Sequence, residues 1–105
     1  MRRKGKMIRI FTLRDCPYCE GAKLLLAREK VMFGVVDLTR DRGEKRARIA
    51  SETGCDTLPS VWIGSIYVGG LETGPPPYGG LRSVLLRGMI DEIRRHPLVS
   101  RQLPF

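Results

Sequence analysis

The sequence lacks the features that define secreted disulfide scaffolds and membrane proteins. It has only three cysteines, an odd number that does not suit a framework of paired disulfides and fits a reducing compartment. No apolar run reaches the roughly 18 to 20 residues that a membrane span requires. The opening stretch, MRRKGKMIRIF, is charged and has no uninterrupted apolar segment followed by a small-residue cleavage site, as a signal peptide would. We therefore expect a cytoplasmic protein with no membrane partner.

Acidic residues are the scarcer of the two charges. The chain has 11 Asp and Glu against 19 Lys and Arg, which gives a net charge of +8. The basic residues gather near the start, in TRDRGEKRAR and in RRHPLVSR, but acids interrupt the middle stretch and no aromatic residues alternate with the cations. This pattern favours a solvated surface with a general attraction for anions over nucleic-acid readout, so no nucleic-acid partner is expected.

Length and composition predict one globular domain. The chain has 105 residues, of which 42% are hydrophobic and 29% are charged, and both values are ordinary for a globular protein. We assign the domain to residues 1–105, with a basic tail over 1–6 and a second tail over 97–105. No repeat and no change of composition indicates a second domain.

The first half of the sequence predicts a β-α-β unit followed by a helix. MIRIFTL alternates apolar and polar residues like a strand, and a helical pattern opens at Cys16 and Pro17, where the missing N–H of proline has no intrahelical partner to lose. VMFGVVDL is a nearly continuous apolar run, which predicts a second strand covered on both faces and parallel to the first. Asp41 can cap a further helix over about 44–52, which Gly54 can end.

The second half predicts a hairpin, a loop and a final helix. SVWIG and IYVGG are short β-rich runs separated by Gly64 and Ser65, which is typical of a tight hairpin. GPPPYGG cannot continue a helix or a strand, so it is expected to be a loop. Apolar residues then recur at helical spacing until His96 and Pro97 stop the pattern. They are Leu81, Val84, Leu85, Met89 and Ile93. The predicted order is βαβ-α-ββα.

Cys16 and Cys19 lie where the first helix is expected to begin. A thiol at a helix N-terminus faces unpaired N–H groups and the positive end of the helix dipole, and both stabilise the thiolate that disulfide exchange requires. Cys19 follows one turn later and is expected to be deeper and more thiol-like. The pair therefore predicts that Cys16 attacks a disulfide and that Cys19 resolves the mixed disulfide. Arg14 adds positive potential beside the pair, and Asp15 opposes it.

A zinc site and a structural disulfide are the other interpretations of this pair. Cys55 and His96 are the only other soft ligands in the sequence, and they do not form a second close-spaced pair. A working dithiol is therefore favoured, and no metal site is expected.

Two further stretches carry candidate binding residues. In DTLPSVW, Pro59 precedes a β-run, so it lies at a sheet edge or forms a cis peptide in a turn. A cis bond would turn the backbone carbonyl and N–H of Leu58 outward, where they could pair with an extended peptide beside the sulfur. In YVGGLET, two glycines let a backbone approach a ligand or simply turn the chain. The following Glu72 and Thr73 either accept a hydrogen bond from a ligand ammonium or face water.

These motifs in this order resemble a glutaredoxin. The resemblance rests on CPYC after a first strand, GVVDL, TLP where the family commonly has Thr-Val-Pro, and GG followed by a polar pair, over about 7–71. It implies an α/β, thioredoxin-like fold with a four-stranded mixed sheet flanked by three helices. It also implies an enzyme that reduces protein disulfides and glutathione mixed disulfides, with glutathione as reductant and no tightly bound cofactor. The expected partners are glutathione and disulfide-containing or glutathionylated proteins, and the expected state is a monomer.

The resemblance also implies roles for individual residues. Cys16 would be the nucleophile that becomes glutathionylated, and Cys19 would be the resolving thiol. The other positions would line the glutathione site: Tyr18 as a wall, Thr57 and Leu58 beside the cysteinyl part, Pro59 as a cis-proline, and Gly69, Gly70, Glu72 and Thr73 at the γ-glutamyl end.

Three places depart from the family pattern. Leu13 stands where many members have a lysine that supports the thiolate and the glycine carboxylate of glutathione, and only the neighbouring Arg14 could substitute. Glu72 and Thr73 replace a pair that is often two aspartates, and they lead into GPPPYGG. Cys55 stands where many members have a basic residue, and it is either a redox-active side thiol or a buried small apolar residue.

These departures affect glutathione recognition more than dithiol chemistry, so two alternatives stay open. The first is a glutaredoxin-like electron donor that is reduced by a thioredoxin-reductase-type flavoenzyme. The second is a [2Fe–2S] cluster carrier, in which Cys16 from each of two subunits and two glutathiones hold the cluster.

Overall fold

The computed structural model describes residues 8–95 of the chain. The two tails expected over 1–6 and 97–105 lie outside the described residues, as does the expected end of the last helix at His96.

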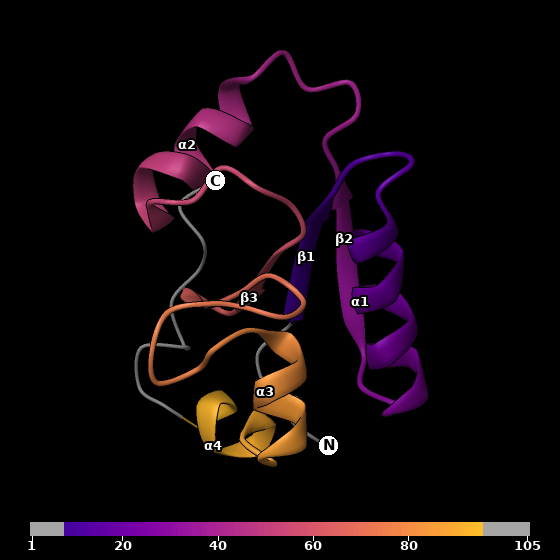
Figure 1. Ribbon diagram of the computed structural model, residues 1–105, viewed down its shortest axis with the longest axis vertical. Helices are drawn as coiled ribbons and strands as arrows, with labels where there is room; N and C mark the ends of the chain where they lie inside the picture. The colour runs from indigo at the N-terminus through magenta and orange to yellow at the C-terminus, as the bar shows by residue number, and fades with distance from the viewer. Residues whose placement is uncertain (1–7, 96–105) are drawn as a thin grey trace, which may run out of the picture.

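A four-stranded mixed sheet forms the centre of the molecule (Figure 1). Its strands are β1 (Ile8–Thr12), β2 (Phe33–Asp37), β3 (Ser60–Ile63) and β4 (Ile66–Gly69), in the order β2-β1-β3-β4. The pairing of β1 with β2 is parallel, whereas β3 is antiparallel to both β1 and β4. The tight hairpin predicted at Gly64 and Ser65 joins β3 to β4, and Gly64 takes the positive φ of 60° that glycine adopts readily. The predicted mixed sheet is confirmed.

The expectation that the second strand is covered on both faces is wrong. In the part of the chain that the structure describes, β2 is an edge strand that pairs only with β1, and Val35 is 45% exposed. The strand is parallel to β1, as predicted, and the helix α1 (Pro17–Arg28) makes the crossover between them. A continuous apolar run predicts a strand but does not determine whether that strand lies at the centre or the edge of the sheet.

The two faces of the sheet are covered by different helices. α1 packs on one face together with α3 (Leu81–Leu86) and α4 (Ile90–Arg94), and α2 (Glu44–Thr53) packs on the other. The larger buried cluster includes Ile8, Ile10, Ala22, Leu26, Val61, Ile63, Val68, Leu81, Val84, Ile90 and Ile93. The smaller cluster consists of Phe11, Leu38, Ile49 and Trp62. Each fully buried aliphatic or aromatic side chain contributes roughly 1.5–3 kcal/mol, so these clusters hold the sheet and helices together.

α2 begins and ends close to the predicted positions. The carboxylate of Asp41 accepts hydrogen bonds from the backbone N–H groups of Gly43 at 2.9 Å, Lys45 at 3.2 Å and Arg46 at 3.4 Å. Asp41 therefore caps the helix as predicted, although Gly43 occupies the N-cap position itself. Gly54 ends the helix with φ of 75°, and its N–H donates to the carbonyl of Ala50.

The single final helix predicted from the apolar spacing is two short helices, so within residues 8–95 the sheet is flanked by four helices and not three. Gly88 adopts φ of 64°, and its N–H donates to the carbonyl of Leu85, which ends α3. A left-handed residue cannot continue an α-helix, and the chain resumes as α4 in a new direction. The apolar spacing is the same on both sides of this break, so periodicity alone does not reveal it.

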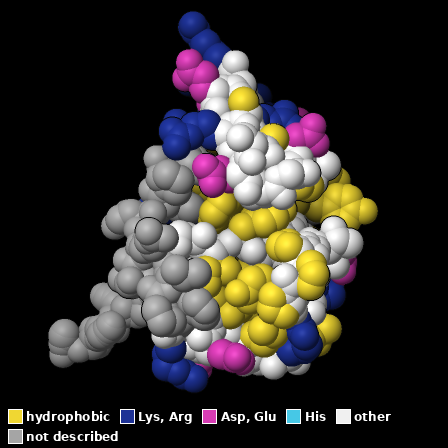
Figure 2. Space-filling model, turned by 90° about the vertical axis from the view of Figure 1, so that its left-hand side faces the viewer, with side chains coloured by type: hydrophobic (Ala, Val, Ile, Leu, Met, Phe, Trp, Pro, Cys, Tyr) yellow, Lys and Arg dark blue, Asp and Glu magenta, His cyan; other side chains and the backbone are white. Residues whose placement is uncertain are grey.

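The surface around α2 is rich in charge. Figure 2 shows basic and acidic side chains at the top of the molecule, where α2 and the loop before it lie, and hydrophobic side chains gathered below them on the same face. Among residues 8–95, no helix combines the length and the apolar character needed to cross a membrane.

Candidate active site

The dithiol lies at the start of α1. Asp15 turns the chain with φ of 56°, Cys16 follows as the N-cap residue in an extended conformation, and Pro17 opens the helix. The backbone N–H of Cys19 donates a hydrogen bond to the sulfur of Cys16 at 3.2 Å. A sulfur at this position accepts one of the N–H groups that a helix leaves unpaired. The predicted placement of the pair is confirmed.

The two sulfurs differ in environment. Cys19 is fully buried, whereas Cys16 is half-buried. Burial raises the pKa of the Cys19 thiol to about 12, and its hydrogen bond to Cys16 also acts to raise that pKa. At neutral pH Cys19 is therefore a buried thiol, one turn along the helix from a sulfur that solvent can reach. This asymmetry is what a nucleophile and a resolving thiol require.

The segment before β3 runs beside the Cys16 sulfur. The Cys16 sulfur lies 3.8 Å from the carbonyl oxygen of Leu58. The peptide bond between Leu58 and Pro59 is cis, which is one of the two arrangements that the sequence left open. A methyl group added to Gly70 would lie 3.2 Å from the carbonyl oxygen of Pro59. The structure thus brings Cys16, Leu58, Pro59 and Gly70 together from three separate parts of the chain.

Glycines close the loop that follows β4. Gly69 has φ of 123°, and a Cβ atom there would collide with the carbonyl oxygen of Thr73. A Cβ atom on Gly74 would collide with the carbonyl oxygen of Val68, and one on Gly80 would lie 2.8 Å from the backbone nitrogen of Thr73. These approaches are too close for any side chain, so the loop folds back on β4 with its backbone in direct contact with the strand.

Glu72, the first residue of the polar pair after the glycines, has a partner that the sequence did not indicate. The Nε–H of Arg82, in α3, donates to the carboxylate of Glu72, with Nε 3.1 Å from both carboxylate oxygens. Both side chains are about half exposed. Thr73 is exposed, and its backbone carbonyl accepts a hydrogen bond from the N–H of Gly70 at 2.8 Å. No sequence motif connects residues 72 and 82, so only the fold reveals this ion pair.

Comparison with known proteins identifies the family. A model of the family described as Glutaredoxin matches residues 8–68. The chain belongs to the glutaredoxin family. It is 41% identical over 63 residues to a glutaredoxin of Pseudomonas aeruginosa, which covers 60% of this chain and 74% of that one. It is 30% identical over 88 residues to Glutaredoxin 1 of Rickettsia prowazekii, which covers 83% of this chain and 85% of that one.

The fold agrees with this assignment. The solution structure of a glutaredoxin from Brucella melitensis superimposes with a TM-score of 0.70 at 31% identity, covering 89% of this chain and 92% of that one. The thioredoxin-like fold predicted from the sequence is therefore confirmed. Because the chain belongs to this family and its relatives are glutaredoxins, the protein is a thiol–disulfide oxidoreductase.

Three residues of this glutaredoxin near the dithiol differ in exposure. Leu13, at the position where the resemblance leads one to expect a lysine, is half-buried and packs against the smaller apolar cluster. Arg14 is exposed, and its backbone N–H donates to the hydroxyl of Thr39 at 2.8 Å, which ties the segment before the dithiol to the loop after β2. Tyr18 is 61% exposed and lies between the two cysteines in sequence.

Cys55 is not the buried apolar residue that was one of its two interpretations. It is half-buried, and its sulfur lies 3.0 Å from the hydroxyl oxygen of Thr57. Hydrogen bonding from Thr57 lowers the pKa of Cys55, and the nearby Tyr67 hydroxyl lowers it as well. Burial raises the pKa of Tyr67 itself to about 12. Thr57 thus turns its hydroxyl to Cys55, on the segment that reaches the dithiol through Leu58.

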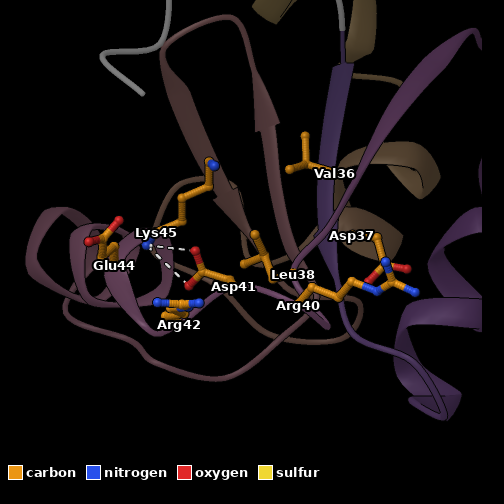
Figure 3. Close-up of a pocket in the computed structure, with 8 residues that line it drawn as sticks. All are labelled: Val36, Asp37, Leu38, Arg40, Asp41, Arg42, Glu44 and Lys45. Atoms are coloured by element: carbon orange, nitrogen blue, oxygen red, sulfur yellow. Dashed lines mark hydrogen bonds between the residues drawn. The ribbon is translucent and has the colours of Figure 1, made fainter.

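A pocket of about 350 Å³ lies between β2 and α2 (Figure 3). Its lining residues are Val36, Asp37, Leu38, Arg40, Asp41, Arg42, Glu44 and Lys45, so three cations face three carboxylates. The Asp41 carboxylate already accepts the backbone N–H groups that start α2, as Figure 3 shows for Lys45. The pocket therefore has no excess of either charge. Among residues 8–95, no three His, Cys, Asp or Glu side chains gather closely enough to hold a metal ion.

Proposed function

We propose that this protein reduces protein disulfides and glutathione mixed disulfides with glutathione as the electron source. The observation that carries the proposal is the asymmetry of the dithiol. Cys16 is half-buried and receives a backbone N–H at the start of α1, while Cys19 is buried with its pKa raised to about 12. One sulfur is ready to attack, and the other keeps its proton until a mixed disulfide forms beside it.

In the proposed reaction, the Cys16 thiolate attacks the glutathione sulfur of a mixed disulfide. A bond forms between the two sulfurs, the original disulfide bond breaks, and its electron pair leaves on the protein thiolate, which takes up a proton. A glutathione thiolate then attacks the disulfide on Cys16, which yields oxidised glutathione and restores the Cys16 thiolate. When the substrate is a protein disulfide, Cys19 attacks the mixed disulfide instead, and two glutathiones later reduce the Cys16–Cys19 bond.

The proposed glutathione site follows the residues that adjoin Cys16. The backbone of Leu58, beside Thr57 and the cis-proline Pro59, would pair with the cysteinyl part of glutathione. Arg14 and Tyr18, both exposed beside the dithiol, would contact the rest of the tripeptide. The γ-glutamyl end would lie over the loop after β4, at Gly69, Gly70, Glu72 and Thr73. The contact of Gly70 with Pro59 supports this path, because it joins that loop to the segment beside Cys16.

The proposed setting is the cytoplasm, where the protein would act as a monomer on disulfide-containing or glutathionylated proteins. Glutaredoxins have reduction potentials of roughly −200 to −230 mV, which a cytosolic glutathione pool can restore. The small, odd number of cysteines in the sequence supports a reducing environment.

A coupled assay with a glutathionylated peptide, glutathione, glutathione reductase and NADPH tests the proposal. Wild-type protein is expected to turn over, Cys16→Ser to lose activity by about a thousandfold or more, and Cys19→Ser to keep removal of glutathione while losing reduction of protein disulfides. Cys55→Ser is the matched control, because it also removes one thiol, and it is expected to keep both activities. A Cys16→Ser protein that retained activity would overturn the proposed roles.

The side chain at position 13 favours a second candidate function, in which a flavoenzyme and not glutathione supplies the electrons. Its side chain packs against an apolar cluster, so no cation at this position supports the glycine carboxylate of glutathione. A thioredoxin-reductase-type flavoenzyme would not need that cation. Wild-type protein that is inert with glutathione yet exchanges disulfides with dithiothreitol would favour this second function.

A further inference from the structure

The turn between β1 and α1, residues 13–15, leads directly into the dithiol. Asp15 adopts φ of 56°, and Cys16 follows it as the N-cap residue of α1. The turn also reaches the second sulfur. Burial raises the pKa of the Cys19 thiol, and a backbone hydrogen bond from Leu13 acts in the opposite direction. The turn therefore adjoins both sulfurs of the dithiol.

The loop after β2 holds this turn from outside. β1 and β2 are parallel, so their carboxyl ends lie at the same edge of the sheet (Figure 1). There the backbone N–H of Arg14 donates to the hydroxyl oxygen of Thr39 at 2.8 Å. The N–H of Leu38 donates to the carbonyl of Thr12 at 2.7 Å. Two hydrogen bonds thus join the loop to the residues on either side of Leu13.

Asp37 orients the Thr39 hydroxyl. The backbone N–H of Thr39 donates to a carboxylate oxygen of Asp37 at 2.8 Å, and the hydroxyl donates to the same carboxylate. These hydrogen bonds from Thr39 lower the pKa of Asp37, so its carboxylate is ionised at neutral pH. Because the hydroxyl proton is directed to Asp37, an oxygen lone pair is left to accept the N–H of Arg14.

We propose that Thr39 is a positioning residue for the resolving step, in which Cys19 attacks the mixed disulfide on Cys16. This inference rests on the proposed function. In that step the Cys19 sulfur gives up its proton and bonds to the Cys16 sulfur. The bond from Cys16 to glutathione breaks, and its electron pair leaves on the glutathione thiolate, which takes up a proton. Thr39 acts on this step through the backbone of the turn.

The resolving step depends on the turn more than the first attack does. Cys19 is fully buried, and burial disfavours the negative charge that its sulfur develops as the proton leaves. The Leu13 backbone acts against that cost, and Thr39 holds the adjacent Arg14 in place. The Cys16 sulfur accepts its N–H from within α1, so the first attack does not need this support.

Rapid mixing of reduced protein with an equal amount of glutathionylated peptide separates the two steps. Acid quenching and mass spectrometry follow the glutathione adduct as it forms and as it gives way to the internal disulfide. Thr39→Val replaces the hydroxyl by a methyl group, Thr39→Ser keeps the hydroxyl, and Asp37→Ala removes the carboxylate that orients it. Thr53→Val is the matched control, because the Thr53 hydroxyl also accepts a backbone N–H, that of Cys55 at 3.1 Å, at the far end of α2.

Thr39→Val is expected to convert the adduct to the internal disulfide about fivefold more slowly than wild type, the effect of one neutral hydrogen bond on a rate. Asp37→Ala is expected to be slower in the same step. Adduct formation is expected to stay at the wild-type rate in both variants. Thr39→Ser and Thr53→Val are expected to match wild type in both steps. Urea titration checks that each variant is folded, as we expect because the hydrogen bonds of Thr39 lie at the surface.

Three results would overturn this inference and leave the proposed function standing. They are a wild-type resolving rate in Thr39→Val, a Thr39→Ser protein as slow as Thr39→Val, and an equal slowing in Thr53→Val. If Thr39→Val did not fold, Asp37→Ala would carry the test, and a wild-type resolving rate in Asp37→Ala would overturn the inference. A wild-type protein that formed no adduct on Cys16 would overturn the proposed function, and the inference with it.

Discussion

At the dithiol, the groups that interact lie within one turn of α1, whereas at the Glu72–Arg82 end they come from two segments ten residues apart. The first arrangement needs only a helix start with a cysteine at the N-cap and another one turn later. The second needs a loop that returns to its own starting point through glycine contacts. The dithiol is thus built by local geometry, and the Glu72–Arg82 end by contacts between separate parts of the chain.

From this difference we expect that the two ends can vary independently. The loop after β4 can be rebuilt, as GPPPYGG indicates here, without moving the sulfur atoms, because the dithiol depends on α1 and on Leu58. Substitutions at the loop should therefore change which disulfides are chosen, and substitutions at the start of α1 should change whether exchange occurs.

The largest expected effect on stability comes from a substitution that disrupts only the loop after β4, which carries Glu72. In Gly74→Ala, the new methyl group would collide with the carbonyl oxygen of Val68 and lie 2.7 Å from the Cα of Gly69, and both neighbours are backbone. We expect a loss of about 2–3 kcal/mol in the free energy of unfolding, measured by urea titration. We also expect reduced turnover of glutathionylated peptide, with dithiothreitol-driven exchange retained.

Gly54→Ala is the control for Gly74→Ala. Gly54 has φ of 75°, and a methyl group added there would meet no atom within 4 Å, so this change costs only backbone strain of about 1 kcal/mol. If Gly74→Ala and Gly54→Ala were equally stable, the expected collision with the β4 backbone would not occur. The account of how the loop after β4 is built would then fail.

The sequence predicted the dithiol end almost completely. Cys16 at the N-cap, Pro17 in the first turn and a deeper Cys19 follow from rules that act over four residues. The sequence also raised the cis peptide at Pro59 as one option. Arg82 was missed because its partner is fixed by tertiary structure, and the glycine contacts of the loop were missed because a glycine in a sequence does not reveal its neighbours.

A second prediction concerns pH and the buried thiol. Burial raises the pKa of Cys19 from its ordinary 9.0 to about 12 in the folded protein. Below about pH 9 both states hold the proton, so the contribution to stability is fully present. As pH rises from about 9 towards 12, the unfolded chain loses the proton first and stability falls, by up to about 1.4 kcal/mol per pH unit. Urea unfolding at about pH 8, 9 and 10 measures this slope.

Cys19→Ala separates this thiol from other groups. The variant is expected to show a shallower decline over the same range, and Tyr67, whose pKa burial also raises to about 12, accounts for part of what remains. If the unfolding free energy of Cys19→Ala fell with pH as steeply as that of wild type, Cys19 would not be held as a thiol. The difference in burial between the two sulfurs would then not control their protonation.

The smallest expected effect concerns Leu13. Leu13→Lys introduces the cation that many glutaredoxins carry at this position, and its aliphatic stem can still cover part of the apolar cluster. We expect roughly a threefold faster reaction with glutathionylated peptide, since one exposed charge contributes less than about 1 kcal/mol. Leu13→Met is the uncharged control, and an equal gain with methionine would exclude a role for charge.

Other parts of the fold show the same limit on prediction. β2 and the last helix were both recognised as elements, but the edge position of β2 and the break at Gly88 were not. In each case the apolar pattern is compatible with two arrangements. Which one forms depends on how many neighbours pack against the element, and that is a property of the whole chain.

The central claim is that Cys16 is the sulfur that takes up glutathione. Cys19→Ser protein, exposed to oxidised glutathione and mapped by mass spectrometry after proteolysis, tests it directly, because no second thiol one turn away can release the adduct. The account predicts one glutathione, bound to Cys16. An adduct on Cys55 with Cys16 unmodified would contradict it.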